Sequence, residues 1–540
     1  MSNLKSGLTL FTLVGLFSCN SGKDSINLET GSDTDTDTDI DTDTDTDTDT
    51  GEAQSLEPKV LMVMIDGFIS DVIPLTDTPA MDRLLQGSAW SMEARAESTT
   101  ISGSGWASFL TGVHWDKHGV PDNSFSEPNF EAYPHVFSLL REAVPDAKVA
   151  GCQSWEPIEE GLVEPSNPDF HSFYDYYQYS SDYFDEASPD RYCGADMAEW
   201  AATSDADLYV VMFGDTDGVG HGYGYGADYP YYQQEITEVD GFILDILESI
   251  DSRSTRAQED WVVIITGDHS GEPSLHHGYN IPDHRLMPLI VSGDAVVPGE
   301  IWPAPKAVDV VPTALAHLGV DLAVWPEWDL DGVPVGFDLS GAPEATLGTN
   351  LVFNGDAEFE RGYDNYTGRP DAWAAGWYDP DYLTVIEYDS PDGFPAGAGP
   401  GPEDRGINFF AGGGVGYDTE IRQFIDVESL ALSIDSGASY TLSGWLGGYA
   451  NQNDRAEFEV RFLEANGTEL STATIGPVGA QRRGGETGLL CEETQGTVPQ
   501  GTRQMEVVLT AKWSSGYNDG YADNLSVVFA DPADPFEACD

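Results

Sequence analysis

Three runs of consecutive apolar residues organise the first part of the chain. Val60–Ile65, Leu208–Phe213 and Trp261–Thr266 are apolar at nearly every position, a pattern typical of strands buried on both faces of a sheet. Alternating strands and helices predict an α/β fold in which helices sandwich a mostly parallel sheet. The segments with helical spacing are Thr78–Gln86, Tyr133–Ala143, Asp190–Ala201 and Gln233–Ser252.

The pattern changes after a short linker at Gly341–Thr349. Apolar and polar residues alternate in Tyr440–Leu446 and Met505–Thr510, and helical spacing disappears. This alternation predicts half-buried antiparallel strands. We therefore expect an α/β domain over residues 58–342 and a separate all-β jelly-roll sandwich over residues 349–531.

The N-terminal segment has the pattern of an export signal. An apolar run at Leu8–Phe17 follows a short start with one cation, and it is too short to span a bilayer as a helix. The run ends near Cys19, where the sequence resembles the lipobox of bacterial lipoproteins, whose cysteine is lipidated. An ordinary secretory signal is the alternative. We expect a lipoprotein signal peptide over residues 1–19 and an exported bacterial lipoprotein at the outer membrane or cell surface, with its lipid anchor in the membrane at Cys19.

Residues 20–57 have a composition that cannot pack into a core. Asp alternates with Thr almost without interruption from Asp33 to Thr50. Like charges two residues apart repel one another, so we expect a disordered, solvated tether. A calcium-binding repeat is the alternative, but the segment lacks the glycines with which calcium loops turn.

The net charge excludes one class of function. The 540 residues include 94 Asp and Glu but only 23 Lys and Arg, which gives a formal charge of −71. Nucleic-acid binding requires clustered cations to replace the counterions of phosphates, so none is expected. Because the tether carries only a minor share of this charge, both domains are expected to be acidic over their surfaces.

Four cysteines follow Cys19, namely Cys152, Cys193, Cys491 and Cys539. An even number in an exported protein predicts two disulfides. Three pairings are possible, and proximity in sequence favours Cys152 with Cys193 and Cys491 with Cys539.

Acidic residues follow all three apolar runs. Because the carboxyl ends of parallel strands meet at one edge of a sheet, these acids are expected to converge with nearby histidines. Carboxylate and imidazole ligands without thiolate suit zinc, with manganese or iron as alternatives. Six ligands exceed the need of one catalytic zinc, so we expect two ions. The six residues are Asp66, Asp217, His221, Asp268, His269 and His277.

The order of motifs resembles the alkaline phosphatase superfamily, and within it the type I phosphodiesterase / nucleotide pyrophosphatase branch. The motifs are Asp66-Gly67, Ser98–Gly112, His118–Asn123, Asp217-x-x-Gly-His221, Asp268-His269, His277-Gly278 and Arg285–Gly293. The resemblance covers roughly residues 58–340 and implies an alkaline-phosphatase-like fold.

The resemblance also implies roles for individual residues. One zinc is expected at Asp217, His221 and His277, and the other at Asp66, Asp268 and His269. The second zinc would also contact the nucleophile, Ser102, for which Thr100 and Ser104 are the alternatives. Asn123 falls where the family places an amide that hydrogen-bonds a phosphoryl oxygen, and His118 is expected to be structural.

The implied reaction is hydrolysis of a phosphate ester through a covalent phosphoserine. The family's Thr-Phe-Pro is replaced here by Ser102-Gly103-Ser104, so the ring that stacks a nucleotide base is missing and nucleotide specificity loses support. The sulfatase motif Cys/Ser-x-Pro-x-Arg is also absent at Ser102. A diester substrate is slightly favoured over a monoester. The alternative is a catalytically silent surface protein whose sandwich binds carbohydrate.

The C-terminal region resembles galactose-binding-like jelly rolls, which include carbohydrate-binding modules. The resemblance rests on the entry Asn350–Glu358 and the exit Gly520–Val528. Such modules often hold a structural calcium ion, for which Asp356, Glu358 and Asp523 are candidates. The resemblance to carbohydrate-binding modules also implies a glycan as a partner.

Overall fold

The computed structural model describes residues 56–163, 188–338, 341–359, 361–362, 374–378, 383–391, 393–414, 416–531, 536 and 539. The expected signal peptide, Cys19 and nearly all of the tether lie outside these residues, so those expectations stay predictions. No helix in the described ranges combines the length and apolar character needed to cross a membrane.

A seven-stranded sheet forms the centre of the first domain, in the order β3-β4-β1-β5-β6-β2-β7. The strands from β3 to β5 in this order pair in parallel, whereas β6 runs antiparallel to both β5 and β2. The mostly parallel sheet predicted from the apolar runs is therefore confirmed. The strands are β1 (Glu57–Ile65), β2 (Ser88–Arg95), β3 (Val149–Gln153), β4 (Leu208–Phe213), β5 (Glu259–Gly267), β6 (Leu286–Gly293) and β7 (Gly299–Glu300).

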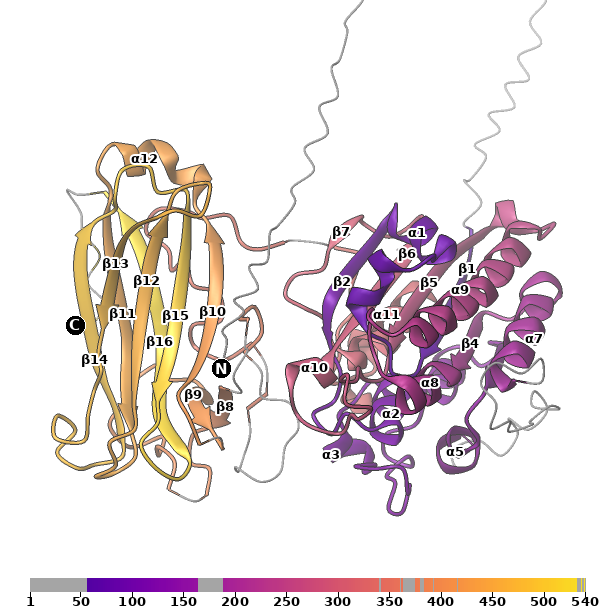
Figure 1. The fold of residues 1–540 in the computed structure, drawn as a ribbon, viewed down its shortest axis with the longest axis horizontal. Helices are drawn as coiled ribbons and strands as arrows, with labels where there is room; N and C mark the ends of the chain where they lie inside the picture. Colours follow the sequence, from indigo (N-terminus) through magenta and orange to yellow (C-terminus); the bar gives the residue numbers. More distant parts are fainter. Residues whose placement is uncertain are drawn as a thin grey trace, which may run out of the picture. The chain divides into compact units, whose positions relative to one another are not determined.

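Helices cover both faces of this sheet (Figure 1). Alternate residues of β1 explain why: Val60 and Met62 belong to one hydrophobic cluster, and Leu61 and Val63 belong to the other. The first cluster includes residues of α2 (Ser102–Thr111), α4 (Val136–Ala143) and α11 (Val310–His317). The second includes residues of α1 (Pro79–Leu85), α7 (Pro189–Thr203), α8 (Asp215–Tyr223) and α9 (Pro230–Asp251).

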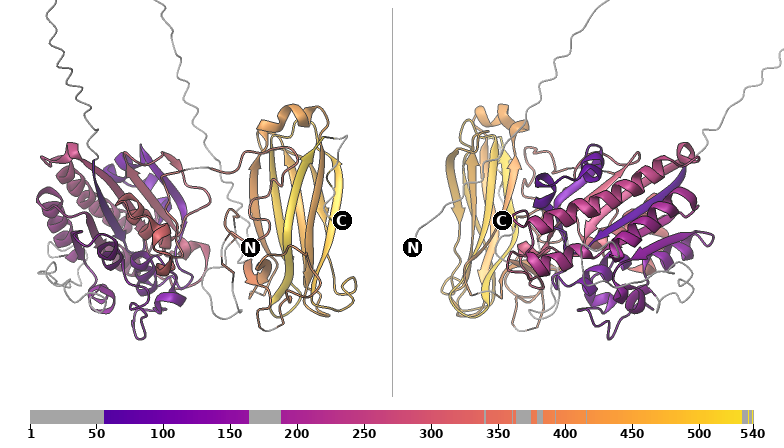
Figure 2. Two further views of the ribbon diagram at one scale, coloured as in Figure 1. Left: turned by 180° about the vertical axis from the view of Figure 1, so that it is seen from behind. Right: turned by 45° about the vertical axis from the view of Figure 1, so that its right-hand side comes forward.

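The longest described helix, α9, illustrates how the sequence specifies its position. Ile236, Val239, Ile243 and Ile250 recur at helical spacing and are all buried. Pro230 occupies the first turn, where a missing N–H costs nothing. The helix packs alongside α7 on the same face of the sheet, and the two appear as neighbouring long helices in Figure 2.

The remaining helices of the first domain are short. They are η1 (Ser70–Leu75), α3 (Trp115–His118), α5 (Glu156–Ile158), η2 (Glu159–Val163), η4 (Arg256–Gln258), α10 (Pro282–Arg285), η5 (Ala307–Asp309), η6 (Leu322–Val324) and η7 (Pro326–Trp328).

The C-terminal region is a sandwich of two antiparallel sheets, as the alternating pattern predicted. One sheet has the order β10-β15-β12-β13 and the other β14-β11-β16-β9-β8. Leu442, Phe458, Val507 and Phe529 belong to the hydrophobic cluster that draws on both sheets. The elements are β8 (Thr384–Glu387), β9 (Asn408–Gly413), β10 (Thr419–Asp426), η8 (Glu428–Leu430), α12 (Ala431–Asp435), β11 (Ser439–Gly448), β12 (Arg455–Leu463), β13 (Glu469–Ile475), β14 (Gly488–Thr497), β15 (Gln504–Lys512) and β16 (Asn518–Ala530).

Two disulfides join the cysteines in the favoured pairing. Cys152 of β3 is bonded to Cys193 of α7, and Cys491 of β14 is bonded to Cys539 near the C-terminus. Their Cα–Cα distances of 5.4 and 5.8 Å lie in the usual range for disulfides. The exact domain limits given above stay predictions.

Candidate metal centre and active site

The carboxyl ends of neighbouring strands bring the predicted acids together. Asp66 directly follows β1 and Asp268 directly follows β5, and these two strands pair in parallel. Gly67 has a left-handed backbone with φ of 66°, and its N–H donates to Asp268 Oδ1 at 3.1 Å. A side chain at this position would be strained, so the glycine allows the chain to turn sharply after Asp66.

The first group of potential ligands is Asp66, Asp268 and His269, all of them buried. His269 Nε2 lies 3.4 Å from Asp66 Oδ1 and 3.3 Å from Asp268 Oδ2. The other ring nitrogen, Nδ1, lies 3.0 Å from the carbonyl oxygen of Ser270. A proton on Nδ1 satisfies that contact and leaves the lone pair of Nε2 directed toward the two carboxylates.

The second group is Asp217, His221 and His277. His221 Nε2 and His277 Nε2 are 3.0 Å apart, and they lie 3.4 and 3.6 Å from oxygens of Asp217. The Nδ1 atoms contact the carbonyl oxygens of Leu275 and Thr100, at 3.0 and 2.7 Å. Both Nε2 lone pairs therefore face the same point, as metal-binding histidines do when a carbonyl fixes their tautomer.

The two groups meet at Asp217. Its carboxylate also forms a potential metal-ligand group with Asp66 and His269, within which the ligand atoms lie no more than 4.8 Å apart. All six residues predicted as ligands are thus brought into one site by the fold.

Two further properties of the six predicted ligand residues suit bound cations. Asp66 Oδ1 and Asp268 Oδ2 are buried and accept no hydrogen bond. Burial and the neighbouring carboxylates raise the pKa of Asp66 and Asp268 well above their ordinary values, and burial and His277 lower the pKa of His269. Buried carboxylate oxygens without a hydrogen bond, and lone pairs that face one another, are costly without a positive ion between them. The site could therefore bind two metal ions, and zinc remains the predicted metal.

Ser102 begins helix α2 and lies against this centre. Its Oγ is 3.3 Å from His269 Nε2. Of the two alternatives, Ser104 is completely buried, and the hydroxyl of Thr100 is used in hydrogen bonds with Tyr279 and Gly278. The geometry thus favours Ser102 as the nucleophile.

Helix α2 approaches the end of β5 very closely. A Cβ atom at Gly105 would lie 2.7 Å from the carbonyl oxygen of Asp268, so glycine permits this approach. Asn123 Oδ1 accepts the N–H of Gly103 at 2.7 Å. This contact fixes the predicted phosphoryl-binding amide beside the N-terminus of α2, where the helix dipole favours an anion.

Two residues that support the ligands had not been assigned this role from sequence. Thr100 accepts a hydrogen bond from His277 Nδ1 through its carbonyl oxygen and has a φ of 37°, which is rare for a residue with a Cβ. Tyr225 is buried, and its hydroxyl donates to Asp217 Oδ1 at 2.5 Å. Its neighbours Tyr223 and Tyr231 are instead half exposed and pack against each other.

His118 has surroundings that suit the expected structural role. It is completely buried, contacts Ser108 Oγ at 2.9 Å, and has a pKa lowered to about 3 by burial and by His114. Ser108 in turn donates to Glu97, which also contacts His114. This buried network lies beneath α2 and not at the metal centre.

The calcium candidates of the sandwich are hydrogen-bonded to protein groups. Asp523 accepts bonds from the Tyr388 hydroxyl at 2.6 Å and the Asn524 N–H at 2.7 Å. Glu358 Oε1 accepts the N–H groups of Ile407 and Asn408, and Asp356 is exposed. Calcium at these residues stays a prediction.

Part of the first domain matches a known protein family. Residues 60–281 match the family model described as type I phosphodiesterase / nucleotide pyrophosphatase. No curated protein matches the chain significantly.

Solved structures match at low identity. A structure described under the metabolism of multiple glycosaminoglycans by Bacteroides thetaiotaomicron is 13% identical, with a TM-score of 0.43 over 68% of this chain and 86% of that chain. A 2-O glycosaminoglycan sulfatase is 13% identical, with a TM-score of 0.42 over 61% and 80%. Murine ectonucleotide pyrophosphatase / phosphodiesterase 5 in complex with AMP is 14% identical, with a TM-score of 0.37 over 51% and 100%.

Proposed function

We propose that the protein is a surface-anchored, two-zinc phosphodiesterase that acts through Ser102, and the match of residues 60–281 to the type I phosphodiesterase / nucleotide pyrophosphatase family model supports this proposal. The observation that carries the proposal is the 3.3 Å contact between Ser102 Oγ and His269 Nε2. It places a hydroxyl at the N-terminus of a helix and at the edge of a six-residue ligand set.

The metal ions, when bound by the two ligand groups, would lower the pKa of the Ser102 hydroxyl and offset negative charge on the phosphate. Ser102 Oγ attacks phosphorus as its proton passes to solvent. A new P–O bond forms, and the bond to the leaving alcohol breaks in line with it. The leaving oxygen takes a proton from water. Water then attacks the phosphorus of the phosphoserine, the bond between phosphorus and Ser102 Oγ breaks, and Oγ takes up a proton. A phosphomonoester and free Ser102 result.

Asn123 and helix α2 hold the substrate during these steps. The Asn123 Oδ1 is occupied by the Gly103 N–H, which leaves its Nδ2 as the group that donates to a phosphoryl oxygen. The positive end of the dipole of α2, which begins at Ser102, stabilises the negative charge that builds up on phosphorus oxygens.

A diester is favoured because of the charges around the site. Among the described residues, no Lys or Arg forms an ion pair with a ligand residue, and the predicted ligands include three carboxylates. A phosphate monoester is a dianion and gains most from a bidentate Arg, whereas a diester carries one negative charge.

The proposal is tested with two aryl substrates and two serine variants. Ser102→Ala is expected to lower hydrolysis of bis-p-nitrophenyl phosphate by at least ~10³-fold, because it removes the nucleophile. Ser104→Ala, two residues further along α2, is the matched control and should retain most activity. Full activity in Ser102→Ala would contradict the nucleophile, and faster hydrolysis of p-nitrophenyl phosphate or p-nitrophenyl sulfate than of the diester would contradict the substrate class.

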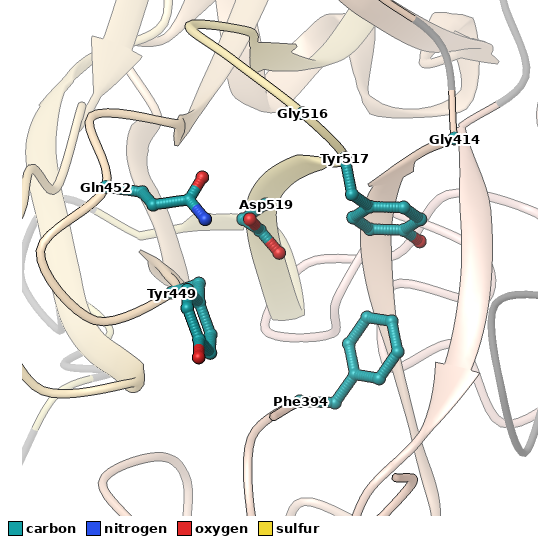
Figure 3. A pocket seen from close by; sticks show the side chains of 7 residues that line it. All are labelled: Phe394, Gly414, Tyr449, Gln452, Gly516, Tyr517 and Asp519. Carbon is teal, nitrogen blue, oxygen red and sulfur yellow. The ribbon is translucent and has the colours of Figure 1, made fainter. Parts of the chain in front are cut away.

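A pocket in the sandwich supports carbohydrate binding as a second candidate function. The residues Phe394, Tyr449, Tyr517, Gln452 and Asp519 line a cavity of about 370 Å³. Figure 3 shows their side chains. Sugar rings stack their C–H faces on aromatic rings and hydrogen-bond to amides and carboxylates. Gln452 also lines this cavity, and its Oε1 accepts no hydrogen bond from the protein.

Affinity electrophoresis through a panel of soluble polysaccharides tests this second function. Retardation by one polysaccharide that is lost in Tyr449→Ala, but kept when exposed Phe424 is replaced by Ala, would support it. Equal mobility of all three proteins in every polysaccharide would contradict it.

A further inference from the structure

Three buried acids form a cluster that the proposed reaction does not use. Asp190 of α7, Asp215 of α8 and Glu235 of α9 present carboxylate oxygens within 4.8 Å of one another. Their exposed fractions are 0%, 7% and 1%. The cluster therefore connects three helices on one face of the sheet.

Two of the three carboxylates have structural hydrogen bonds. Asp190 accepts the backbone N–H groups of Gly214 and Asp215, at 2.8 and 2.9 Å, and thereby caps the start of α8. Asp215 accepts a hydrogen bond from the Ser188 hydroxyl. These contacts explain why the two acids lie here, but they do not explain the third.

No such hydrogen bond explains the position of Glu235. Its Oε2 is buried and accepts no hydrogen bond. A buried carboxylate in this state is unfavourable unless an ion or a proton compensates its charge.

Among the residues described, no Lys or Arg forms an ion pair with any of the three acids. Arg191 follows Asp190 in sequence, but its guanidinium pairs with Glu238 and lies over the ring of Phe242. Three carboxylates this close cannot all be ionised side by side without a cation.

We propose that Asp190, Asp215 and Glu235 bind a calcium ion, separate from the two metal ions of the active site. The donor set consists of oxygen alone, without imidazole or thiolate, and such sets suit hard cations. Calcium fits better than magnesium because magnesium keeps several waters, whereas this site is enclosed by protein carboxylates. The ion would tie α8, which carries Asp217 and His221, to α7 and α9.

The alternative is that the three carboxyl groups share protons and bind nothing. The two cases respond oppositely to Glu235→Gln, which keeps the shape of the side chain. If the group is a neutral acid, the amide replaces it at little cost. If it is a calcium ligand, the amide weakens binding and abolishes stabilisation by calcium. Asp190→Asn is a poorer test because it also disturbs the cap of α8.

The experiment uses the full-length protein in zinc-buffered solution. Equilibrium dialysis with calcium-45 measures bound calcium per chain, and thermal unfolding is followed with and without calcium chloride. Glu235→Gln is compared with wild type and with Glu248→Gln, an exposed acid on the same helix. The difference between variants is decisive, because a calcium ion in the sandwich would contribute equally to all three proteins.

Glu235→Gln is expected to bind about one calcium ion fewer than wild type, and Glu248→Gln the same number. Calcium at one hundred times its Kd should raise the wild-type Tm by about 5–10 °C. Glu235→Gln should lack the part of this rise that comes from this site. The proposal would be overturned if Glu235→Gln and wild type bound equal amounts of calcium, or if calcium did not change the Tm of the wild type. Displacement of calcium by equimolar magnesium or manganese would overturn the choice of ion.

Discussion

His221 and His277 point their Nε2 atoms at each other across 3.0 Å, and each ring is fixed from behind by a backbone carbonyl. Two neutral imidazoles oriented in this way place two lone pairs together, which is unfavourable unless a cation lies between them. The pair is separated by 56 residues in sequence, so only the fold explains the arrangement.

Replacement of His277 is expected to remove one metal ion. His277→Ala should lower the zinc content after dialysis by about one ion per chain, because Asp217 and His221 alone make a weak site. His276→Ala is the control, since His276 is the exposed neighbour. Metal analysis by plasma mass spectrometry checks both. Unchanged metal in His277→Ala, or an equal loss in His276→Ala, would contradict the ligand assignment.

Thr100 is expected to act through His277. Thr100→Val removes the hydroxyl that accepts the Gly278 N–H and donates to the Tyr279 carbonyl oxygen, so the backbone behind His277 loosens. Zinc affinity, measured by competition with a chromogenic chelator, should fall by about 10- to 100-fold. Thr100→Ser retains the hydroxyl and should restore most of the affinity. Should Val and Ser variants bind zinc equally well, Thr100 has no positioning role.

Glu259 gives the protein a predictable sensitivity to acid. Burial alone would raise its pKa, but hydrogen bonds from Arg253, Trp261 and Thr255 outweigh burial and hold the pKa at about 2. A carboxylate with a lowered pKa stabilises the fold above the pKa of the unfolded chain, about 4.5, and loses this effect as the pH falls toward 2.

This contribution amounts to at most roughly 3 kcal/mol. Glu259→Gln should therefore be less stable than wild type at pH 6, and the difference should shrink between pH 5 and pH 2. Urea unfolding of the two proteins across that range is the measurement. A stability difference that stays constant with pH would show that Glu259 is not the titrating group.

The lipid anchor can be tested at Cys19. Cys19→Ser is expected to lose incorporation of radiolabelled palmitate and to move the protein from the membrane fraction to the soluble fraction. Ser18→Ala keeps a small residue before the cysteine and should retain the label. A palmitate-labelled Cys19→Ser protein would rule out lipidation at this position.

Much of the site could be predicted because its chemistry lies at strand ends. Asp66, Asp217 and Asp268 follow apolar runs, and parallel strands bring such positions to one edge whatever the details of packing. Tyr225 and the Asp190–Asp215–Glu235 cluster could not be recognised in the same way. Tyr225 falls in a stretch rich in tyrosines, and only tertiary contacts distinguish this buried donor from exposed Tyr223. The three acids of the cluster belong to three helices, so no local spacing connects them.

The two disulfides also determine what a single break in the backbone would do. Cys152 and Cys193 are joined across a span of 41 residues, and Cys491 and Cys539 across 48. A protease that cut once inside either span would leave both fragments covalently attached. The nicked protein would migrate as one band without reductant and as two bands with it. In the absence of reductant, the chain would thus survive such a cut in one piece.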